Sequence, residues 1–306
     1  MTEPLNSIAI TQNNPRQLDR LGAQRHLYSK AKKILTLHVL LTIPTAVLWS
    51  IMIAIITDLK VWAGLYSVII SALGLFLSNY QKSLKCKAAK IQEVFDCEVL
   101  NMPWNELQSG HPPDAETVQE AADSLKRKST EVDNLRNWYP EVVGKVEIQV
   151  ARLVCQRTNL WWDSNLRRRY ATWLCVILSL TGIIVVVIGL IGKMTIEKLT
   201  LAILAPLLPA LLWGVQEYKS QTETAKTLDR VKEYVGNVWT KTIRNTLSVG
   251  EAETESRKIQ DHIYNHRCQA PLIFDWVYKL LRNKNEKLMN KGAQELIEEA
   301  LKLKTT

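Results

Sequence analysis

The chain has 306 residues, a formal net charge of +9 and 47% hydrophobic residues, but only 12 glycines. It contains no glycine-rich phosphate loop and no GxSxG or HExxH motif, which argues against a nucleotide-binding α/β enzyme and other familiar enzyme classes. The basic residues gather beside long apolar stretches, so they indicate membrane topology and contact with anionic lipids rather than binding to DNA or RNA polymers. We therefore expect a membrane protein that is not an enzyme and needs no cofactor.

Four apolar stretches are each about as long as a helix must be to cross the hydrocarbon core of a bilayer. In chain order they cover residues 34–57, 61–79, 171–191 and 199–215. Short turns join the first to the second and the third to the fourth, so we expect an all-α integral membrane protein with four transmembrane helices in two hairpins. Lysine and arginine are frequent outside the hairpins and sparse in the turns, so the positive-inside rule places both termini in the cytoplasm.

These spans divide the chain into five parts. The parts are an N-terminal cytoplasmic arm and helix (1–33), transmembrane hairpin 1 (34–80), a cytoplasmic helical segment (81–170), transmembrane hairpin 2 (171–216) and a C-terminal cytoplasmic helical segment (217–306). The polar parts show no alternation typical of strands, so we expect a helical cytoplasmic domain. Its helices are predicted over residues 15–33, 80–96, 114–137, 141–169, 217–245, 251–266 and 271–290, with a short charged helix at the end.

Small residues form a stripe along the second predicted span. Gly64, Ser67, Ser71, Gly74 and Ser78 follow one another at spacings of three, four, three and four, which places them on one face of a helix. Such a stripe permits close contact between membrane helices. The same residues can instead line a narrow polar path, but packing is the favoured interpretation.

Prolines interrupt two of the predicted spans. Pro44 lies inside the first span and is expected to kink it. Pro206 and Pro209 lie in the fourth span, which is the shortest, and each of them lacks a backbone donor. A kinked or locally opened helix is therefore expected there, and this span is the predicted moving part.

Arginine and aromatic residues are densest in the run from Cys155 to Tyr170, just before the third span. Arginine binds phosphate through paired hydrogen bonds and aromatic rings stack on bases, so a cyclic oligonucleotide would need both. The same residue types also belong at a membrane surface, and that second interpretation is favoured for the part from Arg167 to Tyr170. The candidate residues for binding a cyclic nucleotide are Arg25, Tyr28, Arg157, Trp161, Trp162, Arg167 and Arg168.

Two further groups have structural explanations. His262 and His266 are four residues apart, a spacing that can bind zinc, but no second cluster completes a site, so no metal is expected. Asp275, Trp276 and Tyr278 lie on an apolar helix face, where packing in the core is the favoured interpretation.

Several motifs occur together along the chain. They are NPRQL at 14–18, AQR at 23–25, YSKAK at 28–32, CQRTN at 155–159, WWD at 161–163, LRRRY at 166–170, SRKIQD at 256–261 and PLIFDWVY at 271–278. As a set they resemble the SMODS-associated four-transmembrane effector family of cyclic-oligonucleotide-based antiphage signalling systems (CBASS). The resemblance covers almost the whole chain, and it carries over no established catalytic or binding residue.

The resemblance implies a role in antiphage signalling at the bacterial inner membrane. A partner nucleotidyltransferase would make a cyclic di- or trinucleotide, and the effector would bind it, form homo-oligomers and disrupt the membrane, so that the infected cell dies. Two other functions stay open: a membrane scaffold that forms no pore and recruits a cytoplasmic partner, and a housekeeping channel or transporter. The spans hold almost no ionisable residue beyond His38, which weighs against a transporter.

Overall fold

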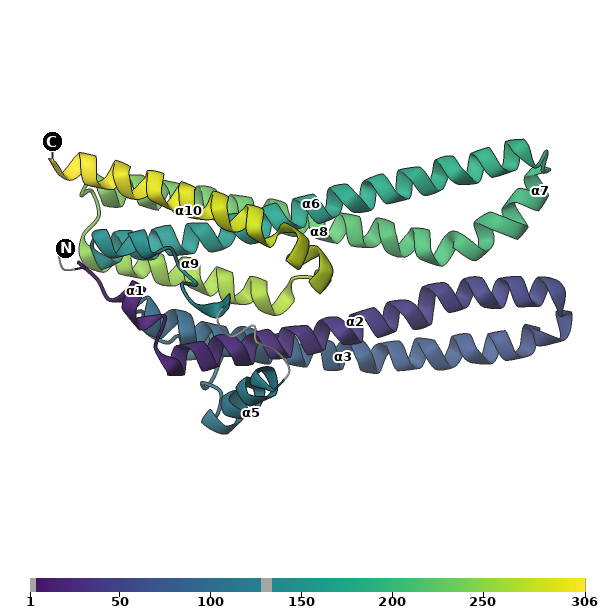
Figure 1. The fold of residues 1–306 in the computed structure, drawn as a ribbon, viewed down its shortest axis with the longest axis horizontal. Coiled ribbons are helices and arrows are strands. Elements are labelled where there is room, and N and C mark those ends of the chain that lie inside the picture. The colour runs from purple at the N-terminus through teal and green to yellow at the C-terminus, as the bar shows by residue number, and fades with distance from the viewer. Residues whose placement is uncertain (1–3, 128–133, 306) are drawn as a thin grey trace.

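The computed structural model describes residues 4–127 and 134–305, and within these ranges every regular element is a helix. Four long helices dominate: α2 (Pro15–Ile55), α3 (Lys60–Val99), α6 (Ile148–Ile191) and α8 (Ala205–Ile243). Figure 1 shows that α2 and α3 lie side by side, as do α6 and α8. The turns that join each pair lie at one end of the elongated molecule, and both chain ends lie at the other.

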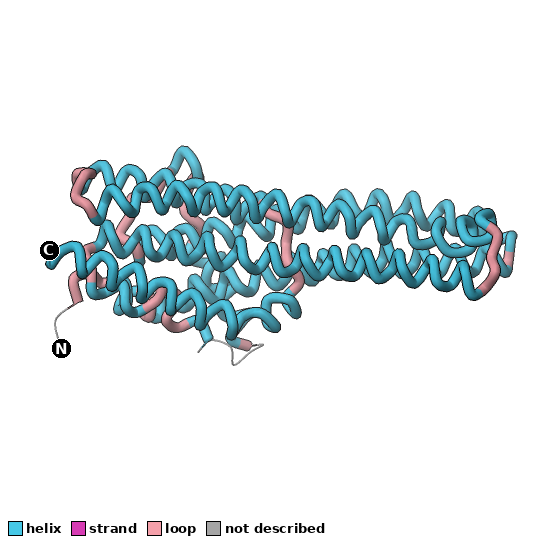
Figure 2. Tube along the Cα trace, turned by 90° about the horizontal axis from the view of Figure 1, so that it is seen from above, coloured by secondary structure: helices cyan, strands magenta, loops and turns pink. Residues whose placement is uncertain are grey.

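Shorter helices surround the end that holds the termini. They are α1 (Ile8–Thr11), α4 (Glu106–Ser109), α5 (Ala115–Lys126), the 3-10 helix η3 (Glu141–Lys145), α9 (Val249–Gln269) and α10 (Asp275–Thr305). Among them, α5 packs on α2, α9 packs on α3, and α10 packs on α6. At the opposite end, the turns hold η1 (Thr57–Leu59), α7 (Ile196–Leu199) and a π-helix, η4 (Thr200–Leu204). Figure 2 shows the same division from above.

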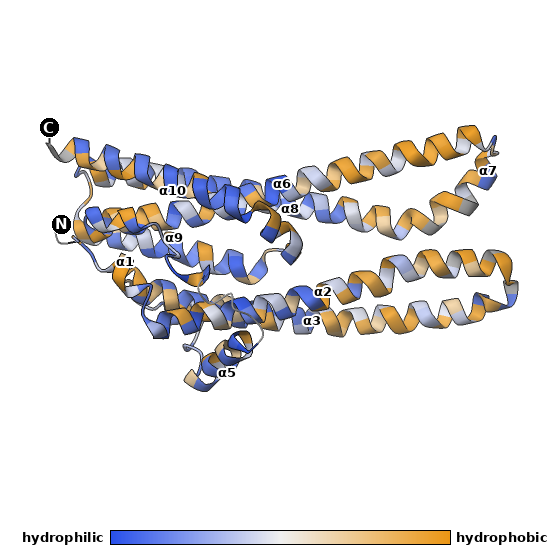
Figure 3. Cartoon of the chain, in the orientation of Figure 1, coloured by the Kyte–Doolittle hydropathy of each residue, from blue (hydrophilic) through white to orange (hydrophobic). Residues whose placement is uncertain are grey.

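Three of the long helices are apolar enough and long enough to cross a membrane. They cover Pro15–Ile53, Lys60–Val99 and Ile148–Ile191, and at most 11% of the apolar stretch of each is buried within the chain. Figure 3 shows that the apolar residues cover the parts of the long helices that point away from the termini. A surface this apolar needs a non-aqueous cover. We call the remaining part of the molecule, residues 4–33, 80–127, 134–170 and 217–305, the polar bundle.

The fourth predicted span does not form one uniform helix. Its first residues belong to α7 and the π-helix, and α8 begins only at Ala205 and reaches charged residues from Glu217 onward. No single α-helix of the described residues therefore offers a long enough apolar window here. The backbone at Pro206 and Pro209 forms the first turns of α8, directly after the π-helix. Whether this region moves stays a prediction.

Two predicted helix boundaries on either side of residue 137 are wrong. Helix α5 ends at Lys126, not at residue 137, although residues 128–133 of that prediction lie outside the described residues. Helix α6 begins at Ile148 rather than residue 141, because a buried loop precedes it. Asn137 has a φ of 53°, which an α-helix does not accommodate. The side chain of Gln12 accepts a hydrogen bond from the backbone N–H of Tyr139 at 2.7 Å, which holds the loop in place.

The C-terminal prediction also differs from the structure. One helix, α10, runs from Asp275 to Thr305, where a helix to residue 290 and a separate short helix were expected. The predicted start near Pro271 is occupied by an extended connection, and the helix begins four residues later. Gly292 does not break the helix, because buried Ala293 and Ile297 continue the packing of α10 on the core.

A buried ionic network holds α3 against α9 in the polar bundle. Asp96 is fully buried and accepts hydrogen bonds from the hydroxyl of Tyr139 at 2.7 Å and from Nε2 of Gln260 at 2.8 Å. Its second carboxylate oxygen also pairs with the guanidinium of Arg267. The network therefore joins α3, α9 and the loop before α6 at one buried carboxylate.

Replacing Asp96 with alanine should destabilise the polar bundle strongly. The variant leaves Arg267 charged and buried without its carboxylate, and losing one partner of a buried ion pair costs about 3–5 kcal/mol. The apparent melting temperature, followed by circular dichroism in detergent micelles, should fall well below that of the wild type. Glu299→Ala, at an exposed position of α10, is the control and should melt like the wild type. Equal melting of the two variants would contradict a structural role for the network.

Candidate functional site

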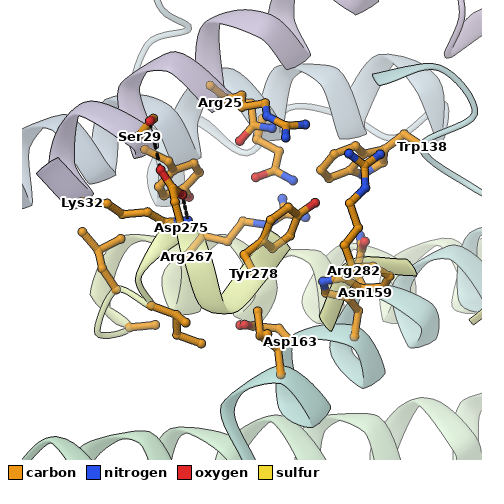
Figure 4. A pocket seen from close by; sticks show the side chains of 18 of the residues that line it. Arg25, Ser29, Lys32, Trp138, Asn159, Asp163, Arg267, Asp275, Tyr278 and Arg282 are labelled. Atoms are coloured by element: carbon orange, nitrogen blue, oxygen red, sulfur yellow. Dashed lines mark hydrogen bonds and ion pairs between the residues drawn. The ribbon is translucent and has the colours of Figure 1, made fainter. Parts of the chain in front are cut away.

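A cavity of about 350 Å³ lies in the polar bundle, between the two pairs of long helices. Side chains of α2, α3, α5, α6, α8, α9 and α10 line it, together with the loop of residues 134–138 and the connection of residues 270–274. The volume is in the range of pockets that bind small molecules. Figure 4 shows how side chains from these separate elements converge.

The lining of the cavity is cationic and aromatic. Eight of the described lining residues are lysine or arginine: Arg25, Lys32, Lys85, Arg136, Arg167, Arg267, Lys279 and Arg282. Three are carboxylic acids: Asp163, Asp275 and Glu286. Four are aromatic: Tyr28, Trp138, Trp162 and Tyr278. This composition suits an anionic ligand that also carries flat rings.

Two of these arginines hold the walls together. The guanidinium of Arg167 donates to the side chain of Gln221 at 2.7 Å and to the carbonyl of Pro271 at 2.9 Å. It thereby ties α6 to α8 and to the connection before α10. Arg267 is paired with the buried Asp96. Both add positive potential to the cavity while most of their hydrogen bonds serve the fold.

Tyr278 lies in the middle of the group in Figure 4, among labelled side chains from α2, α6, α9 and α10. The guanidinium carbon of Arg25 is 6.0 Å and the Nζ of Lys32 is 5.6 Å from the centre of its ring. The ring centre of Trp162 lies 6.2 Å away at an interplanar angle of 50°. Burial raises the pKa of the Tyr278 hydroxyl, so it remains a neutral donor. These contacts bring α2, α6 and α10 to one ring.

Asp275 joins α10 to α2 at the edge of the cavity. Its carboxylate accepts from the Nζ of Lys32 at 2.8 Å and from the hydroxyl of Ser29 at 3.0 Å. Burial alone would raise the pKa of Asp275, but the ammonium of Lys32 and the hydrogen bonds lower it, so the carboxylate is ionised. The carboxylate of Asp275 therefore already neutralises part of the positive charge of the lining.

Asp163 and His266 form a second polar pair in the wall. Burial alone would raise the pKa of Asp163, but Arg167 and a hydrogen bond with Nε2 of His266 hold it well below its usual range. Burial lowers the pKa of His266 and outweighs the hydrogen bond and the charge of Asp163, which raise it, while the charges of Arg167 and Arg267 lower it further. At neutral pH the imidazole is therefore neutral and donates to an ionised Asp163. Among the described residues, no group of three or more histidine, cysteine or acidic side chains is placed to hold a metal ion.

One buried donor among the described lining residues lacks a partner. The indole N–H of Trp138 is buried and has no hydrogen-bond acceptor among the described residues. A buried donor without an acceptor costs free energy, and native structures rarely leave one unsatisfied. An acceptor on a bound molecule, such as a phosphate or base oxygen, would satisfy it.

Four of the seven predicted binding residues line the cavity and three do not. Arg25, Tyr28, Trp162 and Arg167 are in the lining. Arg157, Trp161 and Arg168 are absent from it. Arg168 turns to α8, where it pairs with Asp229 at 2.7 Å. The reason is helical phase: residues 159, 162, 163 and 166 share the face of α6 that meets the cavity, whereas 157, 161 and 168 lie on another face.

The residues that α10 contributes to the cavity were not identified from the sequence. Tyr278 and Asp275 were interpreted as core packing, and Trp138 and Arg282 were not singled out, yet all four line the cavity. The motif at residues 271–278 was a usable signal, because it combines a carboxylate and aromatic rings with an apolar helix face.

The small residues of the α3 stripe differ in their burial. Gly64, Ser67, Ser71 and Ser78 are exposed in the single chain. Gly74 is buried, and a Cβ placed there would lie 2.7 Å from Nε2 of His38 on α2. Only this glycine serves close packing between α2 and α3, so contact of the other four with further helices stays a prediction.

Two comparisons match this chain to known proteins over most of its length. The model of the SMODS-associating 4TM effector domain matches residues 6–296. A probable CBASS effector molecule of Bacillus cereus (strain VD146) is 25% identical over 286 residues, which cover 91% of this chain and 94% of that protein. No solved structure matches the chain.

The buried histidine of the cavity wall should make stability depend on pH. An unfolded histidine takes up a proton near pH 6.5, whereas burial keeps His266 neutral to lower pH, so acidification through this range favours the unfolded state. The apparent melting temperature of the wild type should therefore fall between pH 7 and pH 5, and His266→Gln should show a smaller fall. His262→Gln, on an exposed position of the same helix, should keep the wild-type profile. Identical profiles for all three proteins would show that His266 is not the responsible group.

Proposed function

We propose that this chain, which belongs to the SMODS-associating 4TM effector family and is an antiphage membrane effector, is activated by a cyclic oligonucleotide. The ligand would be a cyclic di- or trinucleotide made by a partner nucleotidyltransferase. Binding would lead to oligomerisation and to permeabilisation of the bacterial inner membrane. No catalytic step by this chain is part of the proposal.

The single observation that carries the proposal is the cationic and aromatic cavity between the two helix pairs. A cyclic oligonucleotide presents phosphates around its ring and bases that stack. The ring centre of Tyr278 lies 6.0 Å from the guanidinium carbon of Arg25, 5.6 Å from the Nζ of Lys32 and 6.2 Å from the ring centre of Trp162, so charge and stacking surface are available within one small volume. The unpaired indole N–H of Trp138 adds a donor for an oxygen of the ligand.

The position of the cavity offers a route for a signal. Helices α2 and α6 line the cavity and continue without interruption into their apolar stretches. A rigid helix that shifts at the cavity must also shift in the bilayer. The ligand can drive this only if it binds the active arrangement more tightly, by about 1.4 kcal/mol for every tenfold change in the ratio of the two states.

In the proposed resting state, Asp275 links α10 to α2. Its carboxylate holds Lys32 and Ser29 of α2 against α10, and α10 itself packs on α6. A ligand phosphate that binds Lys32 competes directly with this carboxylate. Ligand binding would therefore release one of the polar links between the two helix pairs.

The membrane arrangement is part of the same proposal. Residues 199–215 would cross the bilayer as the fourth span, with the π-helix and the first turns of α8 as its irregular part. Both hairpins would then be entered from the cytoplasm, where the termini lie. The exposed residues of the stripe, Gly64, Ser67 and Ser71, are available for contact with another copy.

Leakage of dye from liposomes that contain the protein tests this function. A screen of cyclic di- and trinucleotides should identify one that releases dye, and Arg25→Ala should weaken its binding by about 10- to 100-fold, the usual loss for one charged hydrogen bond. Binding is measured by calorimetry on the protein in detergent. Arg157→Ala is the matched control, because this arginine of α6 lies outside the cavity lining. Absence of leakage with every ligand would favour a scaffold that forms no pore, and equal losses in both variants would move the site elsewhere.

Asp275→Asn should lower the concentration of ligand needed for half-maximal leakage. The variant removes the charge that competes for Lys32, so the ligand phosphate no longer displaces an ion pair. The expected change is a shift of about three- to tenfold, comparable to a partly buried ion pair. Glu286→Gln removes a cavity carboxylate that pairs with Arg282 of the same helix and not with Lys32, so it should shift the curve less. A larger shift for Glu286→Gln would refute competition at Asp275.

A further inference from the structure

The first turns of α10 are held beside the place where α6 becomes apolar. Val277 and Leu281 of α10 are buried against Leu166, Tyr170 and Leu174 of α6. The apolar stretch of α6 begins at residue 171, so this contact straddles the start of the span. In Figure 3, α10 begins beside the part of α6 and α8 where the residues change from mostly polar to mostly apolar.

The opposite face of the same turns is apolar and uncovered. Trp276 is 57% exposed and Leu280 is 67% exposed, and they lie one helical turn apart. Packing in the core was the favoured interpretation for Trp276, and the structure contradicts it. Within the chain, the contact of this indole is a stack on Trp173, with ring centres 6.1 Å apart and an angle of 9° between the planes.

The aromatic contacts set the depth of this face. Trp173 is the third residue of the apolar stretch of α6, and Trp213 of α8 lies near the end of the apolar stretch of residues 199–215. Phe274 contacts Trp213, with ring centres 6.4 Å apart, while Trp276 contacts Trp173. Tryptophan at the ends of membrane spans lies at the level of the lipid head groups. Phe274 and Trp276 are therefore at that level too.

We infer that the start of α10 is a membrane-surface anchor, in which Trp276 and Leu280 enter the boundary between the head groups and acyl chains of the bilayer that α6 crosses. Lys279, which also lines the cavity, is exposed next to them on the helix, and a cation there suits a surface that contains anionic lipids. The anchor requires only that the protein is embedded in a membrane, so it does not depend on the proposed ligand.

The anchor and the cavity share one short segment. Asp275 and Tyr278 line the cavity, while Trp276 and Leu280 face outward from the same turns. Lipid contact would therefore hold one wall of the cavity at the membrane surface. The structure assigns this segment two partners on two faces, one in the polar bundle and one in the bilayer.

Quenching by brominated lipid tests the anchor on the full-length protein. The protein is reconstituted into vesicles of phosphatidylcholine and phosphatidylglycerol whose acyl chains carry bromine close to the head groups. The chain has ten tryptophans, so each Trp→Phe variant removes one emitter of ten. Trp276→Phe should lower the fraction of fluorescence that bromine quenches. Trp104→Phe should raise it, because the indole of Trp104 is bonded to Gly110 near the far end of α3 and emits without contact with lipid.

The quenching experiment gives a different result if Trp276 is covered by something other than lipid. If a second copy of the chain covers this face, Trp276→Phe raises the quenched fraction, as Trp104→Phe does, and the emission depends on the ratio of protein to lipid. If the face is open to water, iodide quenches the wild type more than Trp276→Phe. Either result overturns the anchor. Circular dichroism of both variants, each a conservative replacement, confirms that they are folded.

Discussion

The backbone of a membrane span must satisfy its own hydrogen bonds, and this constraint shapes the rest of the molecule. Helices meet it without help, so α2, α3 and α6 each continue as one helix from the polar bundle through an apolar stretch. The polar bundle is consequently built largely from extensions of membrane helices. Any change in the packing of that bundle acts on helices that also lie in the lipid.

Buried polar groups join several helices of the polar bundle. Asp96, Arg267 and their partners join α3 to α9, and Arg167 ties α6 to α8 and to the connection before α10. Such groups need defined partners in a medium of low dielectric constant, because a buried polar group or charge without a partner is costly. The cavity remains between the pairs, where Asp275 and Tyr278 of α10 reach α2. The cavity is thus cationic and is bounded by an ionised carboxylate.

Segment 270–280 has a central place in this arrangement. It connects α9 to α10, its carbonyl at Pro271 receives Arg167, and its side chains line the cavity. Its aromatic residues also touch tryptophans at the ends of two apolar stretches. It is thus the part of the chain in which the polar bundle, the cavity and the level of the membrane surface come together.

The family and the helical class followed from the sequence, because apolar length and the motifs along the chain are local properties. The approximate extent of α2, α3 and α9 was predictable for the same reason. The apolar spacing of Val143 and Val146 suited an α-helix equally well, but this part forms the short 3-10 helix η3 beside a loop that contacts such as that between Gln12 and Tyr139 hold in place. Likewise, the apolar length of residues 199–215 did not reveal the π-helix within it.

The sequence by itself determined which chemistry the polar bundle would hold, since arginine and aromatic residues before the third span were visible as a cluster. Only the tertiary structure decided which of them share a cavity. Trp162 lines the cavity and Trp161 does not, because of the way α6 is rotated relative to α10. Helix α10 lies more than a hundred residues away in the chain. The positions of Tyr278 and Trp276 depend on the same packing. The two residues lie close together on one helix, yet Tyr278 faces the cavity and Trp276 faces the outer surface. Burial of Val277 against α6 fixes the rotation of α10 that separates them.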